Sequence, residues 1–462
     1  MTSSVDVIVV GGGIAGLSAG YELHTRGVRV AILERAAHAG GVILSEQVDG
    51  FTIDAGPDAL LTQKPEAVQL CEAIGLGNRL VPTRPPRLAF IQRGGRLHTL
   101  PAASVLGIPT AFGPFLRTQL FSWSGKLRMG AEIFVAPRRD GADESIGQFI
   151  GRRFGDEAVT YLAEPLLAGI HAGDVNRLSV RALFPRLVET EAQHGSLLRA
   201  FRRSAAPAQP DGAFRSLPGG LSEMVCALVA ALPSGALRVN SPVTAFTGCA
   251  GGPFRVDTET DRAIEARAII FSTPAYVTGA LVNDLDAGLA ALCHEVPYAS
   301  TATIALAFPR AAVAHPLHGS GFVVPRTEGT GILAASWLSS KWPHRAPENR
   351  VLLRTFVGGA RDPWALSDSD DELIDRSLRA LTPLLGIGAA PLLARVYRFD
   401  RASAQHEVGH LARVAAIDRA LARHPGLFIT GSGFRGVGIP DCIADARVTA
   451  RHVAAYLQHV AV

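Results

Sequence analysis

One segment near the amino terminus restricts the fold more than any other. Residues 5–10 form a short run rich in valine and isoleucine, and an amphipathic stretch follows at 17–26. A second apolar run occupies 28–33. Short β-branched runs are typical of strands in a parallel sheet that is buried on both faces. The segment therefore predicts a β-strand, a helix and a parallel β-strand.

A glycine pattern lies at the turn between the first strand and the helix. Gly11, Gly13 and Gly16 give the spacing Gly-x-Gly-x-x-Gly. In such a unit the first glycine allows the tight turn, the second admits a pyrophosphate, and the third lets helix and strand pack closely. The free N–H groups at the helix N-terminus then face the phosphates. We assign Gly11, Gly13, Ile14, Ala15 and Gly16 to the phosphate site of a dinucleotide.

Glu34 ends the second predicted strand, where a carboxylate accepts hydrogen bonds from a ribose diol and disfavours a 2′-phosphate. We assign Glu34 and its neighbour Arg35 to the nucleotide. These residues do not by themselves decide between FAD and NAD.

The carboxyl end contains a second strand–loop–helix pattern. Residues 425–430 read as a turn and a buried strand, 431–442 as a glycine-rich loop, and 443–457 as a helix. This loop either brings further backbone amides to the cofactor or is an ordinary turn. Strands are also predicted at 237–243 and 268–274, with 191–209 as a helix followed by a loop.

These elements indicate a composite α/β (α+β) fold in which a Rossmann-like domain is interleaved with a substrate-binding domain. The chain, 462 residues long, is divided into five segments. The nucleotide domain takes 1–83, 216–295 and 396–462, and the substrate domain takes 84–215 and 296–395.

Composition and charge exclude several classes of protein. With 48% hydrophobic and 19% charged residues, the chain is expected to bury a core and not to be disordered. A net charge of +4 is too small to indicate nucleic-acid binding. The five cysteines form no Cys-x-x-Cys pair, so neither disulfides nor a zinc site is expected, and a reduced, cytoplasmic setting fits. His406 and His410 share a helical spacing but complete no metal motif, and no metal is expected.

Basic residues are concentrated between positions 84 and 139. This stretch has nine arginines and lysines and a single acid, Glu132. Such an excess suits an anionic ligand or membrane surface, or it is a solvated face. No signal peptide or transmembrane helix is visible. The uncharged segment 97–116, broken by prolines, either lies on a membrane surface or packs in the core.

Glycines after Glu34 resemble an extended flavin fingerprint. Gly40 and Gly41 follow the acid, and Gly56, Pro57 and Asp58 come next. This arrangement resembles that of the amine oxidase and protoporphyrinogen oxidase superfamily. Many members have a basic residue after the glycine pair, where this chain has Val42.

Four further segments resemble the protoporphyrinogen/coproporphyrinogen oxidase family, and they occur in family order. They are 164–174, 321–325, 405–410 and 436–443. Within the family, 106–110 and 341–344 are most similar to the Gram-positive type that acts on coproporphyrinogen III. One departure is Ala404-Gln405-His406, where the family usually has Pro-Gln-Tyr.

The resemblance implies an FAD enzyme that removes six electrons from a porphyrinogen in three flavin cycles. Dioxygen would reoxidise the flavin. Coproporphyrinogen III is the favoured substrate, and protoporphyrinogen IX is an alternative. The resemblance also implies a cytoplasmic protein, peripheral at the inner face of the cell membrane or not, with a haem-pathway enzyme downstream as a second candidate partner.

The resemblance also assigns roles to individual residues. Gly169 would steer a ring N–H with its carbonyl, or it is a helix-breaking glycine. Val323 and Ile332 would sandwich the macrocycle, or they pack in the core. Arg87 is the candidate partner of a propionate, although the match does not separate it from Arg96. The residues expected beside the flavin and its adenine are Gly431, Val437, Gly438 and Ile439, and Val243.

Two alternatives to a porphyrinogen oxidase remain at this stage. One is another flavin oxidase of the same fold, such as an amine oxidase or a desaturase. The other is a binding protein, like the GDP-dissociation inhibitors, whose nucleotide fold carries no working flavin.

Overall fold

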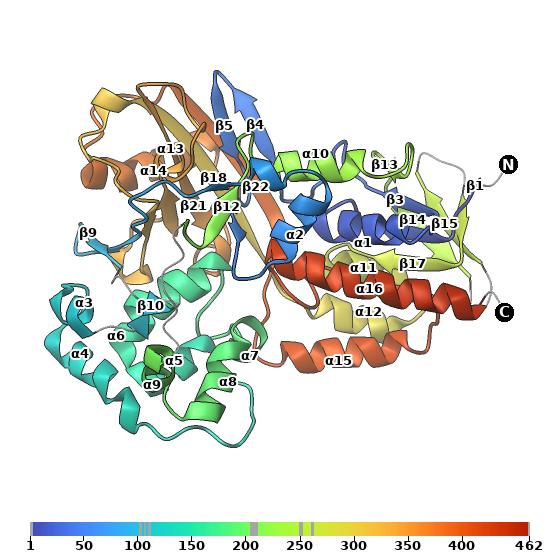
Figure 1. Cartoon of the computed structure of the whole chain (residues 1–462), viewed down its shortest axis with the longest axis horizontal. Helices are drawn as coiled ribbons and strands as arrows, with labels where there is room; N and C mark the ends of the chain where they lie inside the picture. The colour runs from blue at the N-terminus through green and yellow to red at the C-terminus, as the bar shows by residue number, and fades with distance from the viewer. Residues whose placement is uncertain are drawn as a thin grey trace.

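The computed structural model describes residues 3–100, 104–105, 108–109, 112–203, 211–248, 253–259 and 263–460. Figure 1 shows a nucleotide-type α/β body at one end of the molecule, and a large sheet and a helical lobe at the other. No helix among the described residues is long and apolar enough to cross a membrane.

A parallel five-stranded sheet forms the centre of the nucleotide domain. Its strands, in spatial order, are β13 (Leu237–Arg238), β3 (Val30–Leu33), β2 (Val7–Val10), β17 (Ala268–Phe271) and β23 (Leu427–Ile429). Every neighbouring pair is parallel. The predicted strands at both ends of the chain therefore join one sheet.

Alternate side chains of this sheet enter two different cores. Val7 and Val9 pack with one set of helices, whereas Ile8 and Val10 face the other side. The helices of the first side are α1 (Ile14–Thr25), α2 (Glu66–Ala73), α10 (Ser222–Ala230) and α16 (Ile439–Val460). The helices of the second side are α11 (Ala275–Val282), α12 (Ala287–His294) and α15 (His410–Leu421). Burial on both faces is why these strands are apolar at every position.

A smaller sheet lies over the second side. It consists of β1 (Ser3–Ser4), β16 (Ile264–Ala266), β15 (Phe254–Thr258) and β14 (Val243–Thr247). The predicted strand at 237–243 thus divides between β13 and β14. Short pieces connect the domains: the hairpin β4 (Ser45–Val48) and β5 (Phe51–Asp54), and a sheet of β6 (Leu60–Leu61), β12 (Phe214–Ser216) and β7 (Val81–Pro82).

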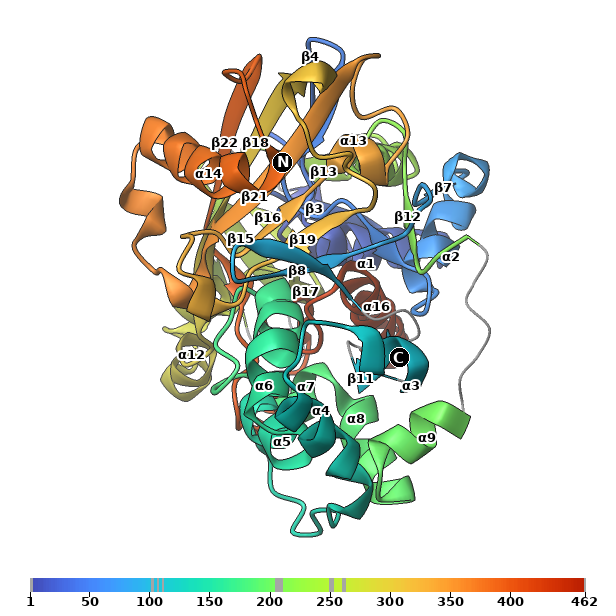
Figure 2. The same ribbon diagram turned by 90° about the vertical axis from the view of Figure 1, so that its left-hand side faces the viewer.

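A seven-stranded sheet forms the second half of the molecule (Figure 2). Its order is β22 (Leu393–Ala404), β18 (Tyr298–Pro309), β21 (Arg350–Gly358), β20 (Ala334–Ser336), β19 (Gly321–Val323), β8 (Phe90–Arg93) and β9 (Arg96–Thr99). Helix α14 (Asp370–Leu385) packs on one face through Leu373 and Leu381. Strand β22 runs across the boundary expected at residue 395.

A helical lobe lies below this sheet in Figure 1. Its elements are α3 (Phe112–Arg117), α4 (Trp123–Gly130), η2 (Ala131–Phe134), α5 (Ile146–Phe154), α6 (Asp156–Ala158), the π-helix η3 (Val159–Ala168), α7 (Val180–Leu183), α8 (Pro185–His194) and α9 (Leu197–Arg203). The expected helix and loop at 191–209 is thus the end of α8 followed by α9, and 204–210 lies outside the described residues.

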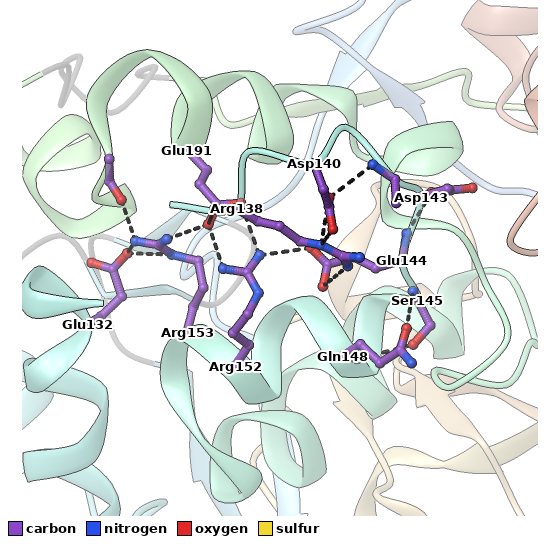
Figure 3. A network of polar contacts seen from close by, with 12 residues as sticks. Glu132, Arg138, Asp140, Asp143, Glu144, Ser145, Gln148, Arg152, Arg153 and Glu191 are labelled. Atoms are coloured by element: carbon purple, nitrogen blue, oxygen red, sulfur yellow. Dashed lines mark hydrogen bonds and ion pairs between the residues drawn. The ribbon is translucent and has the colours of Figure 1, made fainter. Parts of the chain in front are cut away.

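A network of ion pairs holds the lobe together (Figure 3). Arg153 on α5 is fully buried and pairs with Glu132 on η2 and with Glu191 on α8. Arg152 Nη1 lies 2.6 Å from the same Glu191 carboxylate. Glu132 also accepts the N–H of Leu197, at 3.0 Å, at the start of α9. One buried acid thereby joins three helical elements.

Candidate functional site

The glycine loop between β2 and α1 has the geometry of a phosphate site. Gly11 has a φ of +107°, which side chains rarely adopt. A Cβ at Gly16 would lie 2.0 Å from the carbonyl oxygen of Gly11, so only glycine fits there. At Gly13, in contrast, no other group lies within 4 Å of a Cβ position. Helix α1 begins directly after this open position, with Ile14 and Ala15 in its first turn.

Glu34 lies beside this loop. Its Oε2 accepts the N–H of Gly12 at 2.7 Å, and its Oε1 accepts the N–H of Ala36 at 2.8 Å. Gly12, which the sequence analysis did not assign, has to be small because a Cβ there would lie 2.9 Å from the Glu34 Cβ. The carboxylate thus stands at the carboxyl end of the strand, where a ribose would lie. Arg35 beside it is exposed.

The segment after β3 folds back on the glycine loop. The N–H of Gly40 donates to the carbonyl of Gly12 at 2.8 Å, and a Cβ at Gly41 would lie 3.4 Å from Gly13 Cα. The carbonyl of Glu34 accepts the N–H of Ser241 at 2.8 Å, just before β14 begins at Val243. The first glycine loop, the glycine pair and the predicted adenine contact are therefore neighbours.

The second glycine loop reaches the first. A Cβ at Gly431, whose φ is +109°, would lie 3.5 Å from the Cβ of Ala15. Ser272, at the end of β17, donates to the Gly11 carbonyl at 2.8 Å. Helix α16 begins at Ile439, not at 443 as predicted from the sequence, because Pro440 is tolerated in a first turn. Val437, Gly438 and Ile439 are half-buried at this helix N-terminus.

We call the two glycine loops, the pair Gly40–Gly41 and Glu34 the cradle. Residues 56–58 pack beside it. A Cβ at Gly56 would lie 2.0 Å from the carbonyl oxygen of Val42, and Pro57 is half-buried. The Asp58 carboxylate contacts Lys341 Nζ and Trp342 Nε1, both at 2.7 Å, and Arg354 Nη2 at 3.0 Å.

These contacts fix the charge state and the role of the Asp58 side chain. Burial alone would raise the pKa of Asp58, but the cations of Lys341 and Arg354 outweigh it and hold that pKa well below its usual value. Arg354 also donates to the carbonyls of Asp54 and Gly56. The side chain of Asp58 therefore fastens the loop, and a cofactor contact from this residue would come from its backbone.

Lys64 is a further charged residue at the site, which the sequence analysis did not single out. Its Nζ lies 2.6 Å and 2.7 Å from the two carboxylate oxygens of Asp441, in the first turn of α16. This ion pair joins the segment before α2 to the helix N-terminus that the second glycine loop leads into.

His406 and His410 stack on each other, with ring centroids 3.7 Å apart. Their Nε2 atoms lie 2.9 Å and 2.8 Å from the carbonyl oxygens of Ser432 and Phe434. Carbonyls only accept hydrogen bonds, so each ring donates from Nε2. Burial lowers the pKa of His406 to about 4 and that of His410 to about 3, which keeps both neutral.

The histidine pair therefore clamps the second glycine loop. Among the described residues, no group of three or more histidine, cysteine or acidic side chains is arranged to hold a metal ion. The four cysteines in the described part of the chain, Cys71, Cys226, Cys293 and Cys442, are free thiols.

One face of the seven-stranded sheet turns toward this cradle. Val323 is paired with Ala334, Ala334 with Phe356, and Phe356 with Thr303. Residues directly opposite each other in a sheet share a face. Thr303 Oγ1 donates to the Ala55 carbonyl at 2.7 Å, so this row faces the loop that contains Gly56. The row is apolar apart from its threonine and forms one wall suited to a flat apolar ligand.

The other predicted substrate residues occupy different settings. Ile332 is 3% exposed and packs in the core under the opposite face with Phe322 and Trp337. Gly169 follows the π-helix η3, and its carbonyl accepts the N–H of Ala172 at 3.1 Å. Ile170, next to it, is 72% exposed.

Arg87 lies in the loop before β8. Its Nε donates to the carbonyl and the hydroxyl of Thr83, at 3.0 Å and 3.2 Å. A Cβ at Gly212 would lie 2.8 Å from Arg87 Cδ, so this glycine makes room for the arginine. The alternative, Arg96, is exposed on β9.

Comparisons with known proteins identify the family of the chain. The family model described as flavin containing amine oxidoreductase matches residues 14–454. The coproporphyrinogen III oxidase of Bacillus subtilis is 32% identical over 98% of each chain. That of Staphylococcus aureus is 32% identical over 99% of this chain and 100% of its own. The chloroplastic protoporphyrinogen oxidase of Nicotiana tabacum is 29% identical over 99% of this chain and 87% of its own.

Solved structures agree on the fold. A crystal structure from Exiguobacterium sp. 255-15, assigned as a protoporphyrinogen oxidase, has a TM-score of 0.88 and 31% identity, and covers 99% of this chain and 100% of its own. A putrescine oxidase shares the fold at 16% identity, with a TM-score of 0.73, and covers 98% of this chain and 100% of its own. The predicted α/β fold and the choice of FAD over NAD are confirmed. The chain belongs to the family of flavin-containing amine oxidoreductases and is an FAD-dependent oxidoreductase.

Proposed function

We propose that this enzyme oxidises a porphyrinogen to the porphyrin in haem biosynthesis, with coproporphyrinogen III preferred over protoporphyrinogen IX. The observation that carries the proposal is the end-to-end similarity to the Bacillus subtilis coproporphyrinogen III oxidase, 32% identical over 98% of both chains. The apolar row Val323–Ala334–Phe356, which faces the flavin cradle, supports a large flat substrate. The similarity to putrescine oxidase is one of fold and does not indicate the substrate of this enzyme.

The two glycine loops and Glu34 would hold the FAD. The Gly11–Gly16 loop receives the pyrophosphate, Glu34 the ribose, and the α16 N-terminus the flavin end. Bound FAD accepts electron pairs, and three such transfers account for the six electrons removed. The histidine pair holds the Ser432 and Phe434 carbonyls and so keeps the second loop in place.

Other residues would bind and orient the substrate. Val323 and Phe356 would contact one face of the macrocycle. The Gly169 carbonyl has a second lone pair beyond the one that Ala172 uses, and it would orient a pyrrole N–H. Arg87 or Arg96 would pair with a propionate, where a guanidinium binds a carboxylate through two hydrogen bonds. Ile332 would support the wall from within the core.

We also propose the acceptor and the setting. Dioxygen would reoxidise the flavin in the cytoplasm, at the inner face of the cell membrane. The exposed apolar residues of the helical lobe support that location. We propose a haem-pathway enzyme that receives the porphyrin as a second partner, and this proposal is argued from the order of the reactions alone. The five-segment division into nucleotide and substrate domains is part of this proposal, with the last of its four boundaries near the start of β22 at Leu393.

Porphyrin fluorescence tests the proposal. FAD-loaded protein is mixed with chemically reduced coproporphyrinogen III or protoporphyrinogen IX, in air and without oxygen, against a protein-free blank for autoxidation. We expect rapid fluorescence with coproporphyrinogen III and less with protoporphyrinogen IX. Without oxygen we expect at most one porphyrin per three flavins, because each flavin then accepts a single electron pair. No signal above the blank from a yellow protein would refute the porphyrinogen assignment and leave an amine oxidase or desaturase. A protein that cannot be loaded with FAD would contradict the enzyme assignment itself.

A further inference from the structure

Gly169 lies directly after the π-helix η3, at a position that does not need a glycine. Its φ of −60° is helical, so any residue could adopt it. Apart from the adjacent helix backbone, a Cβ there would come within 4 Å of one described atom, the Glu164 carbonyl oxygen at 3.6 Å, which is an ordinary contact. Neither the backbone nor the packing of the described residues therefore requires a glycine, and the small residue agrees with the substrate contact proposed for it.

The π-helix itself fixes Gly169 to Glu164. Pro165 lies inside η3 and has no N–H to donate, so the regular α-helical pattern is interrupted there. The carbonyl of Glu164 instead accepts the N–H of Gly169, five residues further along the chain. Helical turns of this kind are rare and often occur at functional sites. The position of the Gly169 carbonyl therefore depends on where Glu164 is held.

The side chain of Glu164 is tied to the seven-stranded sheet. Its Oε1 lies 2.5 Å from Arg361 Nη2, and its Oε2 accepts the N–H of Arg326 at 3.0 Å. Arg361 Nη1 donates to the carbonyl of Val324 at 2.6 Å, next to the wall residue Val323. The two charged side chains are only 11% and 12% exposed, so solvent screens them little. The ion pair thus joins the π-helix to the apolar wall.

A short turn of the sheet holds the Gly169 segment on both sides. This turn, η6 (Gly359–Arg361), directly follows the wall strand β21. The N–H of Ala360 donates to the Ala172 carbonyl at 2.8 Å, after Gly169 in the chain. Arg361, the next residue of the turn, makes the ion pair that lies before Gly169. The distance between the wall and the Gly169 carbonyl is therefore set by one turn.

We propose that Arg361 and Glu164 are positioning residues, which fix the Gly169 carbonyl relative to the wall that contains Val323. The inference rests on the porphyrinogen oxidation proposed above and adds the device that orients the substrate. Misplacing a reacting group by about 1 Å can cost roughly a hundredfold in rate. The planar guanidinium limits such errors, because it binds the Glu164 carboxylate and the Val324 carbonyl together.

Stopped-flow bleaching of the flavin by coproporphyrinogen III, without oxygen, tests this role in the full-length FAD-loaded enzyme. At saturating substrate, Arg361→Met should slow bleaching by roughly tenfold or more, because the ring N–H is no longer oriented. The half-saturating substrate concentration should change by less than about threefold, because the apolar wall is intact. Arg361→Lys should recover part of the rate, since an ammonium pairs with Glu164 but lacks the planar fork.

A double change separates positioning from a merely structural role. Arg361→Met/Glu164→Met leaves no charge buried without a partner, so it should resist urea better than Arg361→Met. Its bleaching should nevertheless be as slow, because the tie between η3 and the wall is still missing. The comparison therefore holds even where Arg361→Met folds poorly, and the FAD content of each variant is measured beside it.

The matched control is Arg152→Met, in the network of Figure 3. It removes a cation paired with Glu144 and Glu191 elsewhere in the same lobe, and it should leave the bleaching rate unchanged.

The outcomes distinguish this inference from the proposed function. A wild-type enzyme that the porphyrinogen does not bleach would overturn both. If the wild type is bleached, the positioning role alone is overturned by any of three results: Arg361→Met reacts at the wild-type rate, the double change restores the rate together with the stability, or Arg152→Met slows bleaching as much as Arg361→Met.

Discussion

Replacing Arg354 by methionine should destabilise the protein and loosen the flavin cradle. The guanidinium is 1% exposed, pairs with Asp58 at 3.0 Å and donates to the carbonyls of Asp54 and Gly56. Removing one partner of a buried ion pair costs roughly 3–5 kcal/mol, because the other charge stays buried. Asp58 keeps Lys341 and Trp342, so we expect a loss near the lower end, about 3 kcal/mol.

Urea unfolding measures this loss, with Arg398→Met as the control. Arg398 lies on β22 and pairs with Asp370 at the surface, where an ion pair contributes about 1 kcal/mol or less. Arg354→Lys should restore little, because an ammonium cannot donate to two carbonyls and a carboxylate in the same planar geometry. Flavin fluorescence titration should show at least tenfold weaker FAD binding by Arg354→Met, since the Gly56 loop loses its tie.

The difference between the wild type and Arg354→Met should depend on pH. Arg354 helps to lower the folded-state pKa of Asp58, so the stability from this carboxylate is present above its unfolded pKa of about 4. It is lost as pH falls through the lower folded pKa. The gap in unfolding free energy should therefore be full at pH 7 and shrink in acid. A loss no greater than that of Arg398→Met, or a gap that stays constant into acid, would contradict the role assigned to the Arg354–Asp58 pair.

Three further changes test other parts of the site. Glu34→Ala should weaken FAD binding at least tenfold, and Glu34→Gln less, because the amide keeps one acceptor; equal affinities by titration would contradict the ribose role. Arg153→Met leaves Glu132 buried without its cation, while Glu191 keeps Arg152, and it should cost about 3–5 kcal/mol in urea unfolding, whereas a cost below about 1 kcal/mol would show that the network is dispensable. Lys64→Met removes the cation beside Asp441 and should lower the reduction potential of the bound flavin by roughly 30 mV, a tenfold change for a two-electron couple; an unchanged potential would place Lys64 away from the flavin.

The amino-terminal unit was predictable because its signals are local. A buried strand, three glycines at fixed spacing, a helix and a terminal acid lie within one short segment, and each acts on its neighbours along the chain. The structure has β2 at Val7–Val10, α1 from Ile14 and β3 at Val30–Leu33. Glu34 stands beside the glycine loop, as the motif requires.

The second glycine loop shows where sequence reasoning stopped. Its composition allowed either a cofactor contact or an ordinary turn. The structure places Gly431 against Ala15 because β23 and β2 both join β17 in one parallel sheet, so their carboxyl ends meet at one edge. No spacing along the chain encodes that neighbourhood.

The amino-acid sequence was sufficient to predict the nucleotide unit, the class of cofactor fold and the family resemblance. The three partners of Asp58, the stacking of His406 on His410 and the shared wall became visible in the folded chain; that wall consists of Val323, Ala334 and Phe356. The exposure of Trp123, Leu127 and Phe134 likewise became visible there. Local patterns reflect interactions between near neighbours, whereas these features depend on which distant strands and helices pack together.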